Sequence, residues 1–338
     1  MRVLLIKMSS MGDVFHTFPA LTDLMHARPG LVVDWVVEEA FAEIPAWHPL
    51  VERVLPIGLR RWRKQPFSKQ TRQQKAAFFA QVNEQKYDLV LDAQGLLKSV
   101  WVARQIDAPK VGLDWSSARE KLASLFYDRK IQVAKDQHAI SRLRELFAKA
   151  LNYPVPHSPI EYGLNHQAWS SLSELDQQPY VVCLHATTWD TKYWPEDHWQ
   201  QLITKLNQQG LKVVLPWGNP DEKARSERLA ANHQAWCPAQ QLKLTDMARL
   251  LKHAQAVVSV DTGLSHVAAA LDVPMVVLYR VTDPKLVGAF GQQVTHLCSP
   301  LAPNYIKKFK PGQQLQSLQG LSVEDVLQTL AKQGVYRG

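Results

Sequence analysis

The apolar residues of this chain form short continuous runs, separated by longer stretches in which apolar residues recur at helical spacing. Short runs bounded by Gly, Pro, Asp or Asn predict buried strands, and the helically spaced stretches predict amphipathic helices. The predicted strands are 2–7, 32–37, 51–57, 87–93, 180–185, 211–215, 256–260 and 275–279. The predicted helices are 15–26, 69–84, the stretch after Gly95 to about residue 105, 118–126, 137–151, 198–209, 221–231, 245–252, 264–271 and 322–333. Strands that alternate with helices pair in parallel, which predicts an α/β fold with parallel sheets.

Clustered prolines interrupt this alternation near the middle of the chain, at Pro154, Pro156, Pro159 and Pro179. Proline sustains neither a helix interior nor a central strand. We therefore expect two Rossmann-like domains, residues 1–155 and 179–338, joined by a linker at 156–178, with the last helix free to pack back on the first domain. Ligands of such folds bind at the carboxyl ends of the strands, so a cleft between the two sheets is the predicted site.

The composition is that of a globular protein: 338 residues, of which 46% are hydrophobic and 21% charged. No apolar run has the length of a membrane span, and the first apolar run is too short for a signal peptide. The three cysteines, Cys183, Cys237 and Cys298, are scattered, which favours free thiols over a disulfide or metal framework. A cytoplasmic protein is expected.

The net charge of +8 is concentrated in one segment. Residues 54–83 contain no Asp or Glu and hold seven cations: Arg60, Arg61, Arg63, Lys64, Lys69, Arg72 and Lys75. Such a field attracts an anionic partner, which could be nucleic acid, anionic lipid or a phosphorylated sugar; a merely solvated basic face is the alternative. Trp62 and Phe67 in the same segment favour an amphipathic partner.

The strongest chemical signal is the segment 261–266, Asp-Thr-Gly-Leu-Ser-His, which follows the apolar run 256–260 and precedes an alanine-rich helical stretch. A strand-to-helix turn of this kind presents free backbone N–H groups and the positive end of a helix dipole, which together suit a phosphate. Asp-Thr-Gly is also the motif of aspartic proteases, but there it lies in an all-β chain. The helix that follows here is against that alternative.

The first predicted strand is followed by residues 8–13, Met-Ser-Ser-Met-Gly-Asp. Only Gly12 is a glycine in this turn, so the Gly-rich fingerprint of dinucleotide-binding proteins is absent. Asp13 would lie at the start of a helix, facing the cleft. It has two interpretations, a helix cap or a general base that accepts a proton from an attacking hydroxyl. His16 could tune it.

Turns of the second half carry further polar groups at the ends of predicted strands. Thr187, Thr188 and Lys192 could hold phosphate oxygens, and Glu222 could bind a ribose diol. The alternative for each is a solvated surface residue. The histidines are dispersed and no Cys-x-x-Cys occurs, so we expect no metal. Lys192, the threonine hydroxyls and the helix start at 262–264 would then neutralise a departing phosphate.

Five segments together resemble the lipopolysaccharide heptosyltransferases of glycosyltransferase family 9, and the resemblance spans nearly the whole chain. They are 8–13, 92–96 (Asp-Ala-Gln-Gly-Leu), 185–188 (His-Ala-Thr-Thr), 192–195 (Lys-Tyr-Trp-Pro) and 261–266. The resemblance implies a GT-B fold, in which two Rossmann-like domains face each other across a cleft. It also implies ADP-L-glycero-β-D-manno-heptose as donor at the C-terminal domain and Kdo2-lipid A as acceptor at the N-terminal domain. Transfer would invert the anomeric centre in one displacement, without a metal.

The resemblance also implies roles for individual residues. Asp13 falls at the catalytic base, and Lys192 acts both in catalysis and in donor binding. The implied donor-binding residues are Thr187, Thr188, Lys192, Glu222, Leu242, Asp261, Thr262, Gly263 and His266. The implied acceptor-binding residues are Arg60, Arg61, Arg63, Lys64 and Arg119. The chain departs from the family at Leu242, where close relatives carry Met, and at Arg280-Val281, where the family usually has Gly-Pro.

The predicted function is that of a monomeric glycosyltransferase that binds no nucleic acid and works at the inner face of the cytoplasmic membrane. Three alternatives stay open. The chain could transfer a second heptose, could be a nucleotide-sugar epimerase of the same fold, or could be an anion-binding protein without catalytic activity.

Overall fold

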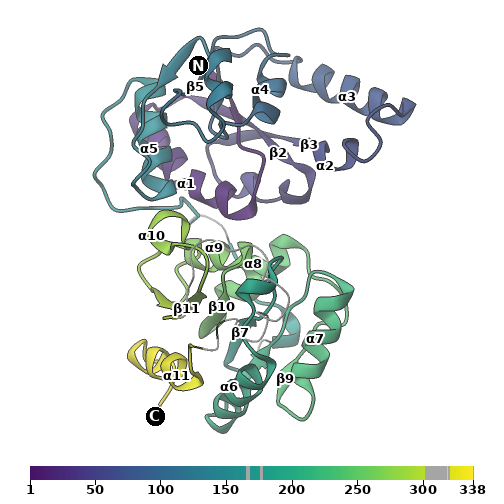
Figure 1. Cartoon of the computed structure of the whole chain (residues 1–338), viewed down its shortest axis with the longest axis vertical. Helices are drawn as coiled ribbons and strands as arrows, with labels where there is room; N and C mark the ends of the chain where they lie inside the picture. Colours follow the sequence, from purple (N-terminus) through teal and green to yellow (C-terminus); the bar gives the residue numbers. More distant parts are fainter. Residues whose placement is uncertain (165–167, 176–177, 301–317, 319, 338) are drawn as a thin grey trace. The chain divides into compact units, whose positions relative to one another are not determined.

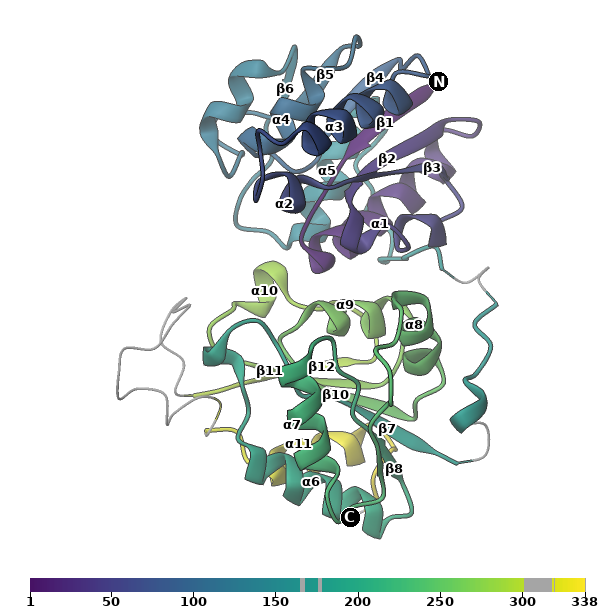
Figure 2. The same ribbon diagram turned by 90° about the vertical axis from the view of Figure 1, so that its right-hand side faces the viewer.

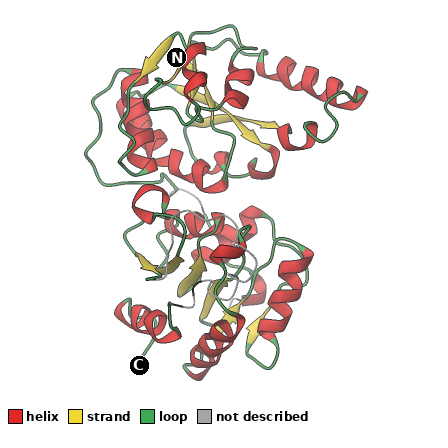
Figure 3. Cartoon of the chain, in the orientation of Figure 1, coloured by secondary structure: helices red, strands yellow, loops and turns green. Residues whose placement is uncertain are grey.

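The computed structural model describes residues 1–164, 168–175, 178–300, 318 and 320–337. The chain divides into two compact units, Met1–Gln167 and Ala168–Gly338. Each unit is a parallel β sheet with helices packed on it (Figures 1, 2 and 3), so the predicted α/β fold class is confirmed. The domain limits predicted from the prolines, 1–155 and 179–338, stay a prediction.

The sheet of the first unit has six strands among the described residues, in the order β3-β2-β1-β4-β5-β6, all parallel. The strands are β1 (Arg2–Ile6), β2 (Val32–Glu38), β3 (Val51–Ile57), β4 (Leu89–Asp92), β5 (Lys110–Leu113) and β6 (Arg129–Ile131). This order is that of a doubly wound Rossmann sheet, in which the strand order reverses between β1 and β4. The turns after β1 and β4 therefore lie side by side at the carboxyl edge.

Helices cover both faces of this sheet (Figure 2). They are α1 (Met11–Ala27), α2 (Leu59–Trp62), α3 (Lys69–Val82), α4 (Leu97–Ala103) and α5 (Ala139–Leu151), with 3-10 helices η1 (Glu39–Phe41), η2 (Pro45–Trp47) and η3 (Lys121–Phe126). Leu4 and Ile6 of β1 pack in one apolar cluster with Phe78 of α3 and Val102 of α4. Because successive strand side chains alternate between faces, Val3 and Leu5 are left for the opposite face, where α1 and α5 pack together.

The second unit repeats this plan, with the sheet order β12-β11-β10-β7-β8-β9 among the described residues. The strands are β7 (Tyr180–Leu184), β8 (Lys212–Val214), β9 (Ala235–Trp236), β10 (Ala256–Val260), β11 (Met275–Tyr279) and β12 (Val294–Cys298). The helices are α6 (Glu196–Gln208), α7 (Pro220–Ala230), α8 (Leu244–Lys252), α9 (Gly263–Ala270), α10 (Pro284–Val287) and α11 (Val323–Lys332), with 3-10 helices η4 (Ser173–Leu175) and η5 (Asp190–Lys192). The central strands β7 and β10 are buried along their whole length.

Several predicted elements differ from the structure. The stretch 118–126 is the short 3-10 helix η3 rather than a helix of that length, which suits its charged and small residues. Strands β5, β6, β9 and β12 were not predicted, because they are short or carry polar residues at a sheet edge. Helix α11 has its apolar residues Val326, Leu327 and Leu330 in the core of the second unit, where it packs against α6 and β11.

Two further findings bear on the site. Helix α1 begins at Met11, four residues before the predicted start, which brings Asp13 into its first turn. In the part of the chain that the structure describes, no helix combines the length and the apolar character that a membrane span requires.

Candidate active site

In the first unit, Asp13 follows β1 at the carboxyl edge of the sheet. Its Oδ2 accepts hydrogen bonds from the Ser10 backbone N–H at 2.8 Å and from the Ser10 hydroxyl at 3.1 Å. Its Oδ1 lies 3.3 Å from the Lys7 ammonium, and 39% of its side chain stays exposed. The two sequence interpretations are therefore compatible, because one oxygen caps the helix start while the other stays beside a cation and within reach of solvent.

The environment of Asp13 stabilises the ionised carboxylate. Partial burial raises its pKa, but the positive charge of Lys7, the neighbouring His16 and the Ser10 N–H together outweigh burial and lower the pKa to about 2. An opposite charge within a few ångströms and hydrogen bonds to the charged form both act in this direction. Asp13 is thus ionised throughout the neutral range.

The turn after β4 holds this loop in place. The Gln94 side-chain oxygen accepts the backbone N–H groups of Met8, at 2.9 Å, and Ser9, at 3.1 Å. The Lys7 ammonium, buried with its residue 6% exposed, also donates to the Ala93 carbonyl at 3.2 Å. Lys98 of α4 donates to the Ser9 hydroxyl at 2.9 Å. The loop that carries Asp13 is therefore tied to the neighbouring strand rather than to its own helix alone.

The Gln94 turn is itself fixed by the buried Asp92. Asp92 Oδ1 accepts from the backbone N–H groups of Gln94 at 2.9 Å and Gly95 at 3.1 Å, and Oδ2 accepts from the Tyr127 hydroxyl at 2.7 Å. Gly95 has φ +65°, a conformation that favours glycine. Burial raises the pKa of Asp92, and its hydrogen-bond donors oppose that rise. The segment 92–96 is thus the support of the β1 loop.

Sequence reasoning missed Lys7, Gln94 and Lys98. Lys7 was counted as the last residue of a strand, and neither its pairing with Asp13 nor its burial is visible in a sequence. Gln94 lies within a segment that the sequence analysis singled out, so its position was the available signal.

The predicted acceptor-binding cations are exposed, and the structure describes all of them. Arg60, Arg61, Arg63 and Lys64 lie on and directly after α2, and Arg119 lies in the loop before η3. Arg61 is ion-paired with Glu39, 2.8 Å between Nη2 and Oε2, so its charge is partly compensated. Arg119 adjoins Glu120, whose carboxylate accepts the Leu97 N–H at 2.7 Å at the start of α4. Arg119 is therefore placed near the Gln94 turn through this contact.

In the second unit, the turns after the paired strands β7 and β10 meet at the carboxyl edge. The Thr187 hydroxyl donates to the Asp261 carbonyl at 3.0 Å, and the Lys192 ammonium lies 2.6 Å from Asp261 Oδ2. The same ammonium lies 4.4 Å from the centroid of the Trp189 ring. Thr262 is the N-cap of α9 and Gly263 begins it. The structure thus brings together a lysine, a threonine hydroxyl and a helix N-terminus. That they bind phosphate oxygens stays a prediction.

The other predicted donor residues are spread around this edge. Glu222 lies in the first turn of α7 after β8, where its carboxylate accepts the Gly218 N–H at 2.7 Å. Thr188 is exposed directly after Thr187, and His266 is buried in α9. Leu242 lies partly exposed just before α8. Among the contacts described for this part of the chain, none joins Leu242 to the Lys192–Asp261 pair. The donor-binding role of Leu242 stays a prediction.

Two buried groups border the same edge. His185, at the end of β7, bonds the Ser226 hydroxyl of α7 through Nε2 at 2.8 Å, and burial, followed by the charge of Arg225, lowers its pKa to about 3. It is therefore a neutral link between β7 and α7. Arg280 follows β11 and is only 7% exposed; burial lowers the pKa of its guanidinium.

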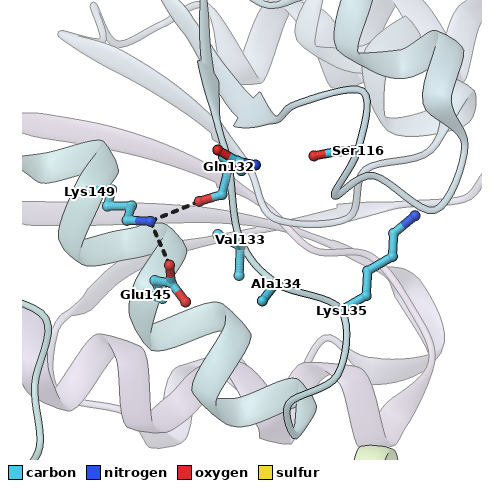
Figure 4. A pocket seen from close by; sticks show the side chains of 7 residues that line it. All are labelled: Ser116, Gln132, Val133, Ala134, Lys135, Glu145 and Lys149. Atoms are coloured by element: carbon cyan, nitrogen blue, oxygen red, sulfur yellow. Dashed lines mark hydrogen bonds and ion pairs between the residues drawn. The ribbon is translucent and has the colours of Figure 1, made fainter.

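A hollow elsewhere in the first unit contains none of the predicted site residues. It has a volume of about 410 Å³ and lies between α5 and the segment after β6. Figure 4 shows Lys149 directed at Glu145 and at the backbone of Gln132, with distances of 2.5 Å to Glu145 Oε1 and 2.9 Å to the Gln132 carbonyl. Two of the charged side chains that line this hollow, Lys149 and Glu145, are thus paired with each other. Across the residues that the structure describes, no three His, Cys, Asp or Glu side chains are grouped to hold a metal ion.

Comparison with known proteins places the chain in a family. The model of glycosyltransferase family 9 (heptosyltransferase) matches residues 75–317. Lipopolysaccharide heptosyltransferase 1 of Salmonella typhimurium is 50% identical over 301 residues, 89% of this chain and 95% of the relative. The protein of the same name from Pseudomonas aeruginosa is 51% identical over 307 residues, 90% of this chain and 86% of the relative.

Similar solved structures agree with this family assignment. The Escherichia coli heptosyltransferase WaaC with ADP superimposes with a TM-score of 0.89 at 45% identity, covering 98% of this chain and 99% of that one. The same enzyme with ADP-2-deoxy-2-fluoro heptose gives 0.87 at 44% identity, covering 98% and 100%. These matches confirm the resemblance found in the sequence and, because that enzyme is a GT-B glycosyltransferase, the predicted GT-B fold. The chain belongs to glycosyltransferase family 9 and is a heptosyl-transferring glycosyltransferase.

Proposed function

We propose that this enzyme transfers L-glycero-D-manno-heptose from ADP-L-glycero-β-D-manno-heptose to the Kdo of Kdo2-lipid A, in synthesis of the lipopolysaccharide inner core. The names of relatives that share half of its residues support the reaction. The ADP ligands named for the similar solved structures support the donor. The observation that carries the mechanism is the ionised Asp13, whose Oδ1 lies 3.3 Å from Lys7 at the carboxyl edge of the first sheet.

The donor is expected at the edge formed by the turns after β7 and β10. Its diphosphate carries negative charge, which suits the Lys192 ammonium, the hydroxyls of Thr187 and Thr188, and the N-terminus of α9 at Thr262. Glu222 is a hydrogen-bond acceptor that suits ribose hydroxyls. We propose that these groups neutralise the leaving ADP without a metal or other cofactor.

The acceptor is expected at the first unit. The carboxylates of Kdo and the phosphates of lipid A are anionic, and Arg60, Arg63, Lys64 and Arg119 are exposed cations. We propose that the enzyme is a monomer in the cytoplasm, associates peripherally with the inner face of the cytoplasmic membrane, and binds no nucleic acid. Anionic headgroups attract basic surfaces with a strength of about 1 kcal/mol per cation.

The reaction is a single displacement. A Kdo hydroxyl attacks the anomeric carbon of the heptose while its proton passes to Asp13, and the bond between that carbon and the diphosphate oxygen breaks with both electrons leaving on ADP. One displacement inverts the anomeric configuration. A carboxylate with a pKa of about 2 is a weak base, so it accepts the proton late, after bond formation to carbon has acidified the hydroxyl. Lys192 offsets the charge that develops on ADP.

The alternatives from the sequence are tested by one product assay. The enzyme is given ADP-heptose with either Kdo2-lipid A or the same acceptor already carrying one heptose. The proposal expects heptose on Kdo2-lipid A alone. Product on the heptosylated acceptor alone would assign the second transfer instead, and a changed nucleotide sugar without transfer would indicate an epimerase. Family membership is against a protein without catalytic activity.

The first prediction concerns Asp13. Asp13→Asn removes the proton acceptor but keeps the size of the side chain, so kcat falls by about 10²–10⁴-fold, the usual effect of losing a general base. The shift in melting temperature caused by ADP stays as in the wild type, because the donor site is in the other unit. Asp107→Asn, an exposed acid of the same unit, is the matched control and keeps normal turnover. Normal turnover of Asp13→Asn would refute the assignment.

The second prediction is a pH effect. The pKa of Asp13 lies below its usual value largely because of Lys7, so Lys7→Gln raises it. The base works only when it is deprotonated, so kcat falls once the pH drops below the pKa of Asp13. In the wild type this fall occurs at low pH, and in Lys7→Gln it occurs at higher pH. Lys7→Arg keeps the positive charge, so kcat falls at the same low pH as in the wild type. If all three profiles coincide, Lys7 does not control the base.

The third prediction concerns the donor. Lys192→Ala removes a cation that we expect at the diphosphate, and hydrogen bonds to charged groups contribute about 1.5–3 kcal/mol, or roughly 10–150-fold in affinity. Titration calorimetry with ADP measures the loss, and the ADP-induced rise in melting temperature shrinks with it. Lys205→Ala, an exposed lysine of α6, serves as control. An unchanged ADP affinity of Lys192→Ala would contradict this site.

A further inference from the structure

Exposed apolar side chains are concentrated on one part of the first unit. Among the described residues, seven large apolar side chains between positions 67 and 126 are more than a third exposed: Phe67, Leu97, Trp101, Trp115, Leu122, Leu125 and Phe126. All but Phe67 and Trp115 belong to α4 or η3. Phe67 reaches 83% exposure. A group of this kind on one side of a domain marks an interaction surface more often than scattered single residues do.

Three of these side chains, Leu97, Trp101 and Phe126, line two hollows that share Trp101. The first, of about 230 Å³, lies between α2 and α4, where Trp62, Pro66 and Trp101 line it together with the cations Arg63, Lys75 and Lys98. The second, of about 320 Å³, lies between α4 and η3, lined by Trp101, Arg104 and Phe126 among others. Trp101 therefore stands between two open hollows, and the apolar surface continues from α2 to η3.

Cations lie directly over the aromatic rings of this surface. The Lys75 ammonium is 5.6 Å from the Trp101 ring centroid, and the Arg104 guanidinium carbon is 5.1 Å from that of Phe126. The segment 54–83, which supplies α2 and α3, contains no acidic residue. Aromatic rings with long basic side chains laid across them suit the boundary between lipid headgroups and acyl chains, because rings enter the apolar layer while cations reach phosphates.

We propose that this surface, named the α2–α4 surface and defined by the exposed side chains Phe67, Leu97, Trp101, Leu125 and Phe126, docks on the leaflet of an anionic membrane. Its aromatic side chains enter the outer acyl region, the hollow beside Trp101 receives part of an acyl chain, and Lys75, Lys98 and Arg104 pair with lipid phosphates. The proposal rests on the proposed lipid acceptor. It extends that function because Arg63 belongs both to this hollow and to the acceptor-binding cations.

Charge favours a membrane over a protein partner as the occupant. Seven cations and no acid in residues 54–83 match a phosphate-rich surface. A purely electrostatic contact would be lost in high salt, whereas apolar insertion is retained. Salt dependence therefore separates a docked apolar surface from a basic face that only attracts headgroups.

The test is sedimentation of the full-length enzyme, without any acceptor, with vesicles of phosphatidylcholine alone or mixed with phosphatidylglycerol. Wild type is expected to bind the mixed vesicles and to stay partly bound in high salt. The triple variant Phe67→Ser, Leu125→Ser, Phe126→Ser binds the mixed vesicles at least about tenfold more weakly, because each substitution removes apolar area from the interface. The control Val287→Ser, Phe290→Ser changes two comparably exposed residues of the second unit, 39% and 42%, and binds normally.

Activity separates this proposal from the proposed function. The triple variant is expected to turn over an acceptor stripped of its acyl chains at the wild-type rate, and a vesicle-embedded acceptor at least tenfold more slowly. If the wild-type enzyme turns over no acceptor but still binds vesicles, the proposed function is wrong and the docking surface is not contradicted. If the wild type does not bind the mixed vesicles, or if the triple variant binds them as the wild type does, the proposed docking surface is wrong. Self-association lost in the variant would assign it to a protein interface instead.

Discussion

The candidate site of the first unit depends on one ion pair, between the Lys7 ammonium and Asp13. Lys7 is the residue after β1 and is nearly fully buried, so its charge must be compensated. Asp13 supplies that compensation at 3.3 Å, and the Ala93 carbonyl shares the ammonium. The Gln94 side chain then fixes the intervening backbone. The result is a carboxylate that is ionised, oriented and still partly open to solvent.

The second unit also has a lysine–aspartate ion pair at the carboxyl edge of its sheet, but there the acid rather than the lysine follows the strand directly. There the acid, Asp261, directly follows a central strand, and the lysine, Lys192, arrives from the turn after the neighbouring strand, 2.6 Å away. In both units the pair lies where the strand order of a doubly wound sheet reverses, the place at which such folds bind ligands. The first pair keeps a carboxylate ionised. The second holds an ammonium against the residue that precedes the N-cap of α9.

Much of this was visible in the sequence, and the misses have physical reasons. Continuous apolar runs identified the central strands β1, β4, β7, β10 and β11, because strands buried on both faces need apolar residues at every position. Edge strands such as β6 and β9 lack that signal. The candidate site segments were selected because they follow predicted strands and precede predicted helices. Lys7 was missed because a lysine after a strand gives no sign of burial, and the Arg61–Glu39 pair because it joins residues that only the fold brings together.

The central claim, that Lys7 keeps Asp13 ionised, is tested most directly by carbon NMR of the free enzyme with labelled aspartate, using the Asp13→Asn variant to assign the signal. The carboxyl resonance of Asp13 is predicted to stay at its ionised position as the pH falls through 4 and to begin titrating only near a pKa of about 2. A midpoint at or above 4, the ordinary value for aspartate, would contradict the account.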